Sequence, residues 1–335
     1  MKYRNMGKHG LKLSEISIGT MYHGSYFSEK QSHIVLKEAI NQGINFIDCA
    51  DRYGIEDSNL PMEQRTPAEK VLGTFLKTQN RDDLVISSKV FKQLRKTPNN
   101  GGLSRKHIQE SIRQSLGYLQ TDYLDIYFCH RVDNQVPLEE TIRTMTNLID
   151  DGRVHYWGTS WAPPYIIERA IGIAKENGLI SPTVEEPPYH INARFIESDL
   201  FHVADYHGLG ITAFEALATG FYTGKYLDGI PEDSRGAIVE HLPQNIIDER
   251  REQILALREV ASSLEIPLSQ LMFAWVLRNP QISSAIMGAS KPEQVIENCG
   301  ASGIVLPQDA LEKIEAILDN DPRKKYHYRF DQRPD

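Results

Sequence analysis

The sequence predicts a single α/β domain over residues 1–335, a (β/α)8 TIM barrel with an N-terminal β-hairpin and extra helices. Three observations lead to this fold class: short apolar runs alternate with helix-like segments, the runs number eight, and each is nearly continuous in apolar character. Runs of this kind are typical of strands buried on both faces of a parallel sheet. Because strands and helices in strict alternation form right-handed parallel crossovers, eight units indicate a closed barrel instead of an open sheet.

The expected strands are short and rich in β-branched and aromatic residues, as strands in a buried sheet usually are. They cover Ile16–Thr20, Asn45–Ala50, Leu84–Val90, Tyr123–His130, Val154–Ser160, Thr183–Tyr189, Gly210–Leu217 and Ser283–Ala289.

Helix-like segments separate these strands, and their ends carry the usual signals. Ser104 is placed to cap a helix, Gly43 and Gly178 stand where helix-stopping glycines stand, and Pro292 falls in the first turn of the helix after the last strand. The segments include Glu29–Gln42, Pro67–Thr78, Ser104–Leu119, Leu138–Asp150 and Pro164–Asn177.

One segment breaks the alternation. Ala218–Gln244 follows the seventh strand and contains glycine, proline and charged residues, so we expect a long loop that serves as a lid or a binding loop. Residues 246–264 then predict an extra helix before Pro267–Arg278. Neither an internal repeat nor a linker is recognisable, so one domain is the simplest organisation.

Composition restricts the classes of function. Hydrophobic residues make up 40% of the chain and charged residues 24%, which is typical of a globular protein with a full core. The net charge of −8 disfavours binding to nucleic acid or to an anionic membrane surface. The three cysteines, Cys49, Cys129 and Cys299, are odd in number and two of them lie in apolar runs, so we expect no disulfide framework; without a Cys-x-x-Cys pair we expect no zinc or redox site. Residues 1–10 lack the apolar core of a signal peptide, and no apolar run is long enough for a membrane span, so we expect a soluble cytoplasmic protein.

Four polar residues end or follow consecutive predicted strands, where the active sites of barrels lie. Asp48 and Tyr53 follow the second strand, Lys89 ends the third and His130 ends the fourth. Each has an ordinary structural explanation when taken alone: a solvated lysine, a tyrosine packed in a turn, a histidine at the barrel rim. Their joint position on adjacent strands favours a catalytic group.

These residue types suit the reduction of a carbonyl, which needs hydride at carbon and a proton at oxygen. Tyr53 can donate the proton if its pKa is lowered, and a neighbouring ammonium on Lys89 lowers the pKa of a phenol. Asp48 can hold Lys89 charged and oriented. His130 can hydrogen-bond the carbonyl oxygen as charge develops on it.

The segments around these residues resemble the active-site motifs of the aldo-keto reductase family. Phe46–Gly54, Ile86–Lys89 and Tyr127–His130 carry the family's Asp, Tyr, Lys and His tetrad in order. Four further segments resemble the branch that contains bacterial reductases and the β subunits of voltage-gated potassium channels: Met1–Asn5, Gly102–Ile108, Tyr156–Trp161 and Pro292–Asn298. The resemblance runs nearly end to end, and it implies NAD(P)H-dependent reduction of a small aldehyde, ketone or sugar-like carbonyl.

The resemblance also implies where a nicotinamide cofactor binds. It puts the nicotinamide near Thr20, Asp48, Ser160 and the end of the seventh strand, including Leu217. It puts the phosphates and the adenosine half near Lys225, Arg235, Gly288, Ser290, Gln294, Glu297 and Asn298. The residues themselves agree in part, because a loop of small residues at the N-terminus of a helix is a ready phosphate site. Taken alone, the same loop is only a turn.

Three departures from the family pattern concern this cofactor site. Glu186 stands where a glutamine usually holds the nicotinamide amide, and a carboxylate accepts from the amide nitrogen but cannot donate to its oxygen. After the seventh strand, Phe214 can still stack on the nicotinamide, whereas Glu215 replaces a hydroxyl near the diphosphate. Gln294 stands where an arginine often does. NADP(H) is favoured by resemblance, and NAD(H) stays open.

Substrate choice falls to the loops Met21–Phe27, Arg131–Gln135 and Ala218–Gln244. We expect the substrate pocket to be lined by Tyr22, His23, Tyr26, Trp161 and Tyr222. This mixture of aromatic and polar side chains suits sugars and aryl aldehydes alike. The expected partner is a small-molecule carbonyl, and a homo-oligomer is left open.

Two other functions are compatible with the sequence. The resemblance to channel β subunits suggests a regulatory subunit that binds a cofactor with little turnover. Those subunits usually carry asparagine at the position of His130, so the histidine favours catalysis. Glu186 and Glu215 suggest a third alternative, epimerisation or elimination by redox chemistry at a bound cofactor.

Overall fold

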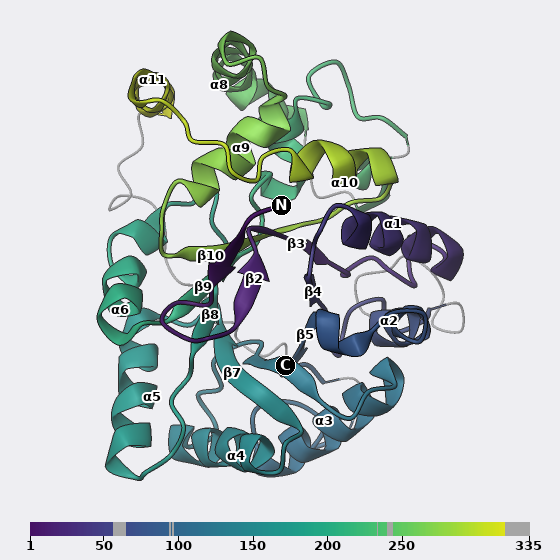
Figure 1. Cartoon of the computed structure of the whole chain (residues 1–335), viewed down its shortest axis with the longest axis vertical. Coiled ribbons are helices and arrows are strands. Elements are labelled where there is room, and N and C mark those ends of the chain that lie inside the picture. The colour runs from purple at the N-terminus through teal and green to yellow at the C-terminus, as the bar shows by residue number, and fades with distance from the viewer. Residues whose placement is uncertain (56–64, 94, 96, 233, 240–243, 319–335) are drawn as a thin grey trace.

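The computed structural model describes residues 1–55, 65–93, 95, 97–232, 234–239 and 244–318. Within them, eight parallel strands close a barrel that is surrounded by helices (Figure 1), which confirms the predicted fold class. In pairing order the strands are β10 (Ile282–Met287), β3 (Ile16–Gly19), β4 (Phe46–Asp48), β5 (Val85–Val90), β6 (Leu124–Cys129), β7 (Val154–Ser160), β8 (Val184–Glu186) and β9 (Gly210–Ala213), with β9 paired to β10.

Every predicted barrel strand is present. The second, sixth and seventh, β4, β8 and β9, are clearly shorter than the apolar runs that predicted them. β8 ends at Glu186 because Pro187 and Pro188 follow, and proline has no N–H for the strand ladder. The strand therefore ends with the Glu186 side chain at the carboxyl end of the barrel.

Most helices match the predicted segments, including the extra helix. Three helices, α6, α7 and α11, were not among the segments predicted from the sequence. The helices are α1 (Glu29–Asn41), α2 (Ala68–Leu76), α3 (Arg105–Leu119), α4 (Leu138–Asp150), α5 (Pro164–Glu176), α6 (Leu200–His207), α7 (Arg235–Val239), α8 (Gln244–Ser263), α9 (Leu268–Leu277), α10 (Pro292–Cys299) and α11 (Gln308–Leu318), with the 3-10 helices η2 (Arg81–Asp83), η3 (Phe195–Glu197) and η4 (Ala218–Thr223).

A hairpin of β1 (Tyr3–Asn5) and β2 (Lys12–Ser14) closes the amino end of the barrel, as predicted. Met6 and Leu13 are fully buried against side chains of the barrel interior. Arg4 fixes the hairpin by donating to the backbone oxygens of Leu277 and Ile282, both at 2.9 Å. With this end filled, the opposite end is left for a site.

The long segment after β9 is not a plain loop. It contains the 3-10 helix η4 and the short helix α7, while residues 233 and 240–243 lie outside the description. Glu215 and Thr219 adopt left-handed backbone conformations, with φ of 64° and 60°. Non-glycine residues rarely do so, and such strain is common at functional sites.

The structure also bears on the predictions about disulfide bonds and membrane spans. Cys49, Cys129 and Cys299 are free thiols and buried. In the described part of the chain, no single helix is long and apolar enough to cross a membrane. One pair of segments, Ile247–Ser263 and Leu268–Leu277, reaches that length and composition together, and the pair is bent by 86°.

Candidate active site

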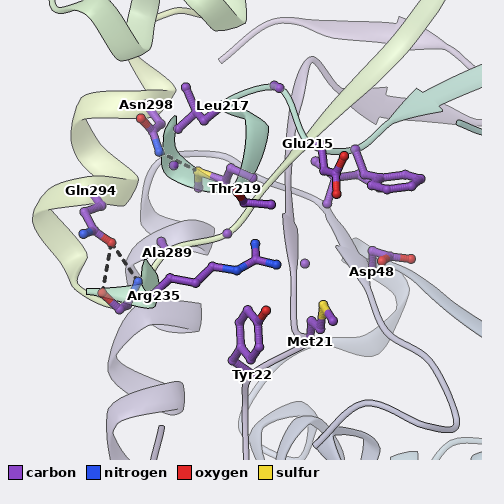
Figure 2. Close-up of a pocket in the computed structure, with 18 of the residues that line it drawn as sticks. Met21, Tyr22, Asp48, Glu215, Leu217, Thr219, Arg235, Ala289, Gln294 and Asn298 are labelled. Atoms are coloured by element: carbon purple, nitrogen blue, oxygen red, sulfur yellow. Dashed lines mark hydrogen bonds between the residues drawn. The ribbon is translucent and has the colours of Figure 1, made fainter. Parts of the chain in front are cut away.

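A cavity of about 590 Å³ opens at the carboxyl end of the barrel. It is bounded by the ends of the strands, the segment after β9 and the start of α10 (Figure 2). Most of the residues that the sequence singled out line this one cavity: Asp48, Tyr53, His130, Ser160, Glu186, Phe214, Glu215, Leu217, Lys225, Arg235, Gly288, Ser290, Gln294, Glu297 and Asn298 on the catalytic and cofactor side, and Tyr22, His23, Tyr26 and Trp161 among the expected substrate contacts.

Lys89 lies beneath this cavity and joins several of the polar residues. Its side chain is fully buried on β5, and its ammonium donates to Asp48, which ends β4. The same nitrogen lies 3.1 Å from the backbone oxygen of Cys49 and 3.4 Å from the hydroxyl of Tyr53. Ser87 adds a hydrogen bond of 2.6 Å to Asp48, which holds that carboxylate in place.

The barrel register brings these side chains together. Asp48 on β4 pairs with Ser87 on β5, two residues before Lys89, so both side chains reach the same end of the barrel. Tyr53 lies in the turn that follows β4, where its backbone oxygen accepts a hydrogen bond of 2.8 Å from Ala68. His130 follows β6, and its ring meets that of Tyr53 edge to face, with 5.9 Å between ring centroids.

Burial raises the pKa of Tyr53 above its ordinary value, while the ammonium of Lys89 opposes this shift. The expected lowering of this pKa by Lys89 is therefore outweighed, and Tyr53 keeps its proton at neutral pH. Burial and the cation of Arg131 hold the pKa of His130 well below its ordinary value. A neutral imidazole and a protonated phenol therefore face the cavity, and both can donate a hydrogen bond.

Glu186 makes a contact that the sequence did not suggest. Its Oε1 lies 3.2 Å from the ammonium of Lys89, so the lysine faces two carboxyl groups. Burial raises the pKa of Glu186 to about 8, with a further contribution from the charge of Asp48. Glu186 is only 3% exposed, and among the described residues its Oε2 has no hydrogen-bond partner.

Glu215 is the second unexpected carboxyl group of the site. Burial raises its pKa, and the cations of Arg235 and Arg131 oppose the shift. Figure 2 shows Glu215 near Asp48, with Gln294 and Asn298 on the opposite side of the cavity and the Arg235 side chain between the two groups. The guanidinium of Arg235 lies 4.8 Å above the ring centroid of Tyr22, so it crosses the cavity from α7.

The loop before α10 has the form expected of a phosphate site, but two of its donors, the N–H and the hydroxyl of Ser290, are used within the protein. The backbone N–H of Ser290 donates to the side chain of Gln294 at 2.8 Å, and the Ser290 hydroxyl lies 3.2 Å from the same oxygen. Asn298 contacts the sulfur of Met287. A phosphate at this loop requires Gln294 to turn away from Ser290.

Two predicted contacts do not line the cavity. Thr20 is fully buried, and its hydroxyl donates to the backbone oxygen of Asp48 at 2.9 Å, so it braces the strand end. Tyr222 is also fully buried, and its hydroxyl donates to Gln253 at 3.0 Å and accepts from Asn192. Tyr222 therefore joins η4 to α8 instead of contacting a substrate.

Some residues of the cavity were not named individually from the sequence: Arg52 was not predicted at all, whereas Arg131 and Thr219 lie within the loops expected to set substrate choice. The arginines directly precede Tyr53 and follow His130, so their adjacency was the available signal. Arg131 lies 5.0 Å from the ring centroid of Trp161, and it donates to the backbone oxygen of His130 at 2.6 Å. Thr219 lies in the predicted binding loop Ala218–Gln244, but nothing in the sequence singled it out within that loop.

Comparison with known proteins agrees with this arrangement. The model of the aldo/keto reductase family matches residues 15–319. A probable voltage-gated potassium channel subunit beta from Oryza sativa subsp. japonica is 36% identical over 98% of this chain and 100% of its own length. A protein of the same description from Arabidopsis thaliana is 37% identical, with the same coverage. A putative voltage-gated potassium channel subunit beta from Schizosaccharomyces pombe is 38% identical over 96% of this chain and 94% of its own.

Proposed function

The chain belongs to the aldo/keto reductase family, and on that premise we propose that it reduces a small aldehyde, ketone or sugar-like carbonyl with NADP(H) as the favoured cofactor. The observation that carries the proposal is the contact of Lys89 with both Asp48 and Tyr53 beneath a cavity that Tyr53 and His130 line. A structural lysine would need only one counter-ion. Here the ammonium also reaches a phenol at the cavity wall.

The roles of the residues follow from their protonation states. Tyr53 enters the reaction with its proton and donates it to the carbonyl oxygen, while the ammonium of Lys89 stabilises the phenolate that forms. Neutral His130 donates a ring N–H to the same oxygen and stabilises its developing charge. Asp48 keeps Lys89 charged: burial alone would lower the pKa of Lys89, but Asp48 and Glu186 hold it above its ordinary value.

The residues present fit a nicotinamide dinucleotide. When bound, the nicotinamide supplies the hydride for the carbonyl carbon. Ser160, Glu186 and Phe214 line the same cavity as Asp48, Tyr53 and His130 and would hold the ring. The cations of Lys225 and Arg235 line the same cavity and are suited to the negative diphosphate. The family generally uses nicotinamide cofactors, usually NADP.

The test is a screen for cofactor oxidation at 340 nm against aldehydes, ketones and keto-sugars, with NADPH and NADH in parallel. We expect turnover with at least one class of carbonyl and a lower KM for NADPH. If no carbonyl is reduced with either cofactor at high enzyme concentration, the proposal is wrong.

The names of the relatives favour a second candidate, a channel-associated regulatory subunit with little turnover. The two candidates differ in the rate after the first catalytic cycle. A reductase continues to oxidise added cofactor in the steady state, whereas a regulatory subunit oxidises about one equivalent of bound cofactor and then stops. Single-turnover and steady-state measurements on the same sample separate them. His130 supports the reductase, since it provides the second hydrogen-bond donor to the carbonyl oxygen.

A further inference from the structure

More groups compete for the ammonium of Lys89 than it can bind. Within 3.4 Å of Nζ lie oxygens of Asp48, Cys49, Glu186 and Tyr53. An ammonium has three N–H donors, so four acceptors cannot all be satisfied at once. The hydroxyl of Tyr53 is the most distant of the four, at 3.4 Å. The three hydrogen bonds run to Asp48, Cys49 and Tyr53, while the carboxyl of Glu186 lies 3.2 Å away as an ion-pair neighbour that competes with Tyr53 for the third N–H when it is ionised.

The charges of this cluster are also unequal. One buried ammonium on β5 faces the carboxyl of Asp48 on β4 and that of Glu186 on β8. Burying a net charge is unfavourable, so one lysine supports one ionised carboxyl, and the second keeps its proton. The charges of Asp48 and of the neighbouring Glu185 favour the neutral form of Glu186, whereas Lys89 favours the ionised form.

Neutral Glu186 has a hydrogen-bond donor that an ionised carboxylate lacks. Its Oε1 faces Lys89, and its Oε2 has no partner among the described residues, although Glu186 lines the cavity. A carboxylic acid in this position can donate from Oε2 into the cavity, and its uncharged Oε1 attracts the ammonium of Lys89 less than a carboxylate does. It can therefore provide the donor that a glutamine amide would provide.

We propose that Glu186 is a proton-dependent positioning residue of the reductase site. In its neutral form it donates from Oε2 to the carboxamide oxygen of the nicotinamide and leaves Lys89 to Tyr53. In its ionised form it loses that donor, competes for the lysine and opposes ionisation of the phenol. The inference rests on the proposed reductase function, and it adds Glu186 to Tyr53 as a second group of the site whose protonation affects the reaction.

The pH range follows from the environment of Glu186. Its pKa is raised to about 8, so the neutral form dominates at pH 7 and the ionised form at pH 9. If only the neutral form binds well, the apparent affinity for NADPH falls by up to about tenfold between pH 7 and pH 9. Binding at pH 8 then takes up about half a proton per site.

Isothermal titration calorimetry measures both the affinity for NADPH and the proton uptake on binding, and it needs no turnover. The proton uptake is obtained at pH 8 from buffers that differ in ionisation enthalpy. Glu186→Gln keeps the donor and cannot ionise, so we expect NADPH affinity that is constant between pH 7 and pH 9 and no uptake. Glu185→Gln is the matched control, because Glu185 bonds Thr159 and the backbone of Ala162 and does not contact Lys89. We expect this control to keep an uptake, with its midpoint at a lower pH than in the parent because the charge of Glu185 no longer favours neutral Glu186.

Kinetics tests the effect on Tyr53. We expect kcat for carbonyl reduction by the parent protein to decrease as the pH rises through about 8. In Glu186→Gln this decrease is absent, so the variant is up to about tenfold faster than the parent at pH 9. KM for the carbonyl should change little, because Glu186 acts through Lys89 and the cofactor and not on the substrate.

The outcomes separate this inference from the proposed function. Proton uptake by the parent and by Glu185→Gln, together with none by Glu186→Gln, supports the inference. Equal uptake and equal pH profiles in all three proteins overturn it while leaving the reductase intact. If Glu186→Gln does not fold, the absence of uptake by the parent alone overturns it. If the parent neither binds NADPH nor reduces any carbonyl, the proposed function fails and this inference fails with it.

Discussion

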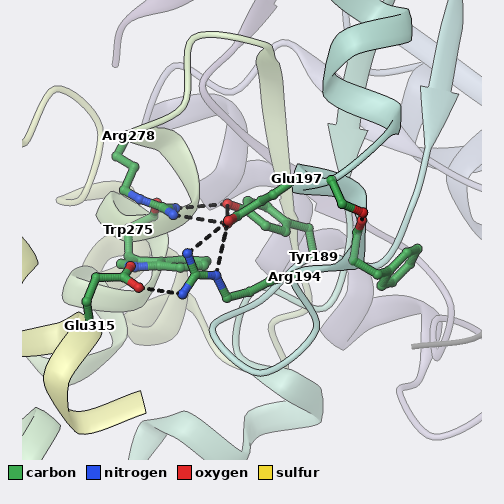
Figure 3. Close-up of polar contacts among 8 residues, drawn as sticks. Tyr189, Arg194, Glu197, Trp275, Arg278 and Glu315 are labelled. Atoms are coloured by element: carbon green, nitrogen blue, oxygen red, sulfur yellow. Dashed lines mark hydrogen bonds and ion pairs between the residues drawn. The ribbon is translucent and has the colours of Figure 1, made fainter. Parts of the chain in front are cut away.

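Two charge clusters of this molecule, one fully buried and one partly buried, use similar side chains in opposite ways. One surrounds Lys89 at the cavity. The other surrounds Glu197 on η3 and joins it to Arg194, Arg278 and Glu315 (Figure 3). In the second cluster two cations meet two carboxylates, whereas in the first a single cation meets two carboxyl groups.

The pairing in the Glu197 cluster is nearly complete. Glu197 accepts from Arg194 at 2.9 Å, from Arg278 at 3.0 Å and from the hydroxyl of Tyr189 at 2.6 Å. Both guanidinium groups also lie over the ring of Trp275, at 5.4 Å and 3.6 Å from its centroid. The cluster therefore joins η3 to α9 and, through Glu315, to α11.

The protonation states record this difference. Burial alone would raise the pKa of Glu197, but its hydrogen bonds with Arg194 and Tyr189 hold it below the ordinary value. Burial does raise the pKa of Glu186, because Lys89 is shared with Asp48. In the Glu197 cluster the carboxylates stay ionised and their ion pairs stabilise the fold. In the Lys89 cluster one carboxyl has no cation of its own, so Glu186 can gain or lose a proton near neutral pH. Four predictions examine this contrast.

The largest effect is expected at the phenol of the unequal cluster. In Tyr53→Phe the proton donor is lost, so kcat for carbonyl reduction should fall by about a hundredfold to ten-thousandfold. Because Lys89 and Asp48 remain paired, the dissociation constant for NADPH should change little. Steady-state kinetics and calorimetry on the same preparation give both quantities. Reduction of a ketone at the parental rate would show that Tyr53 is not the acid.

The paired cluster should affect stability and not catalysis. Glu197→Gln leaves two partly buried guanidinium groups with Glu315 as the one remaining carboxylate of the cluster, and we expect a loss of about 1 to 3 kcal/mol in the free energy of unfolding at pH 7. The pKa of Glu197 is lowered in the folded state, so its stabilisation is present above the unfolded pKa and is lost as the pH falls. The deficit of the variant should therefore shrink in acid.

Urea denaturation at pH 7 and pH 4 measures this deficit. The rate of carbonyl reduction per folded molecule should be unchanged, because Glu197 does not line the cavity. A variant as stable as the parent at pH 7 would mean that the cluster contributes nothing to the fold.

The stability of Glu186→Gln should show the opposite dependence on pH. The pKa of Glu186 is raised to about 8 in the folded state, so the parent is fully stabilised below the unfolded pKa and loses stability as the pH rises through 8. The variant lacks this loss, and its advantage should grow by at most about 1.4 kcal/mol per pH unit between pH 5 and pH 8. Denaturation at three pH values measures it. A constant difference would show that Glu186 does not titrate in this range.

Much of the fold and of the catalytic group could be predicted from local sequence. The barrel strands were recognisable because strands buried on both faces form continuous apolar runs. Helix α6 was missed although Asp199 caps its start and Gly208, with φ of 77°, ends it. Its eight residues are too few to show a clear helical period.

The two clusters themselves could not be predicted, because both depend on contacts distant in sequence. Lys89 and Glu186 lie on β5 and β8, which do not pair, and their side chains meet only because the barrel closes. Tyr222 was misassigned for a similar reason: its place in the segment after β9 suggested the cavity, but α8 covers it. A position next to a strand end predicts which residues reach the cavity. It does not predict that two carboxyl groups such as Asp48 and Glu186 share one lysine.

The smallest effect is expected at Glu215. Its charge is better compensated than that of Glu186 and less completely paired than that of Glu197. It has two nearby cations, Arg235 and Arg131, so its charge is partly offset. Even so, a carboxylate in the cavity opposes a dinucleotide phosphate, and its removal leaves Arg235 free to face that phosphate. Glu215→Ser should bind NADPH about twofold to tenfold more tightly at low salt.

The gain of Glu215→Ser should shrink as salt screens the repulsion and as the pH falls through the raised pKa of Glu215, because the parental carboxyl is then neutral. Glu265→Ser is the matched control: Glu265 also has a positive φ, of 56°, and it is exposed and does not line the cavity. Calorimetric titration of the parent and both variants at low and high salt measures the effect. Equal dissociation constants at low salt would mean that Arg235 and Arg131 already neutralise Glu215, and that the unequal charge of this site is confined to the cluster around Lys89.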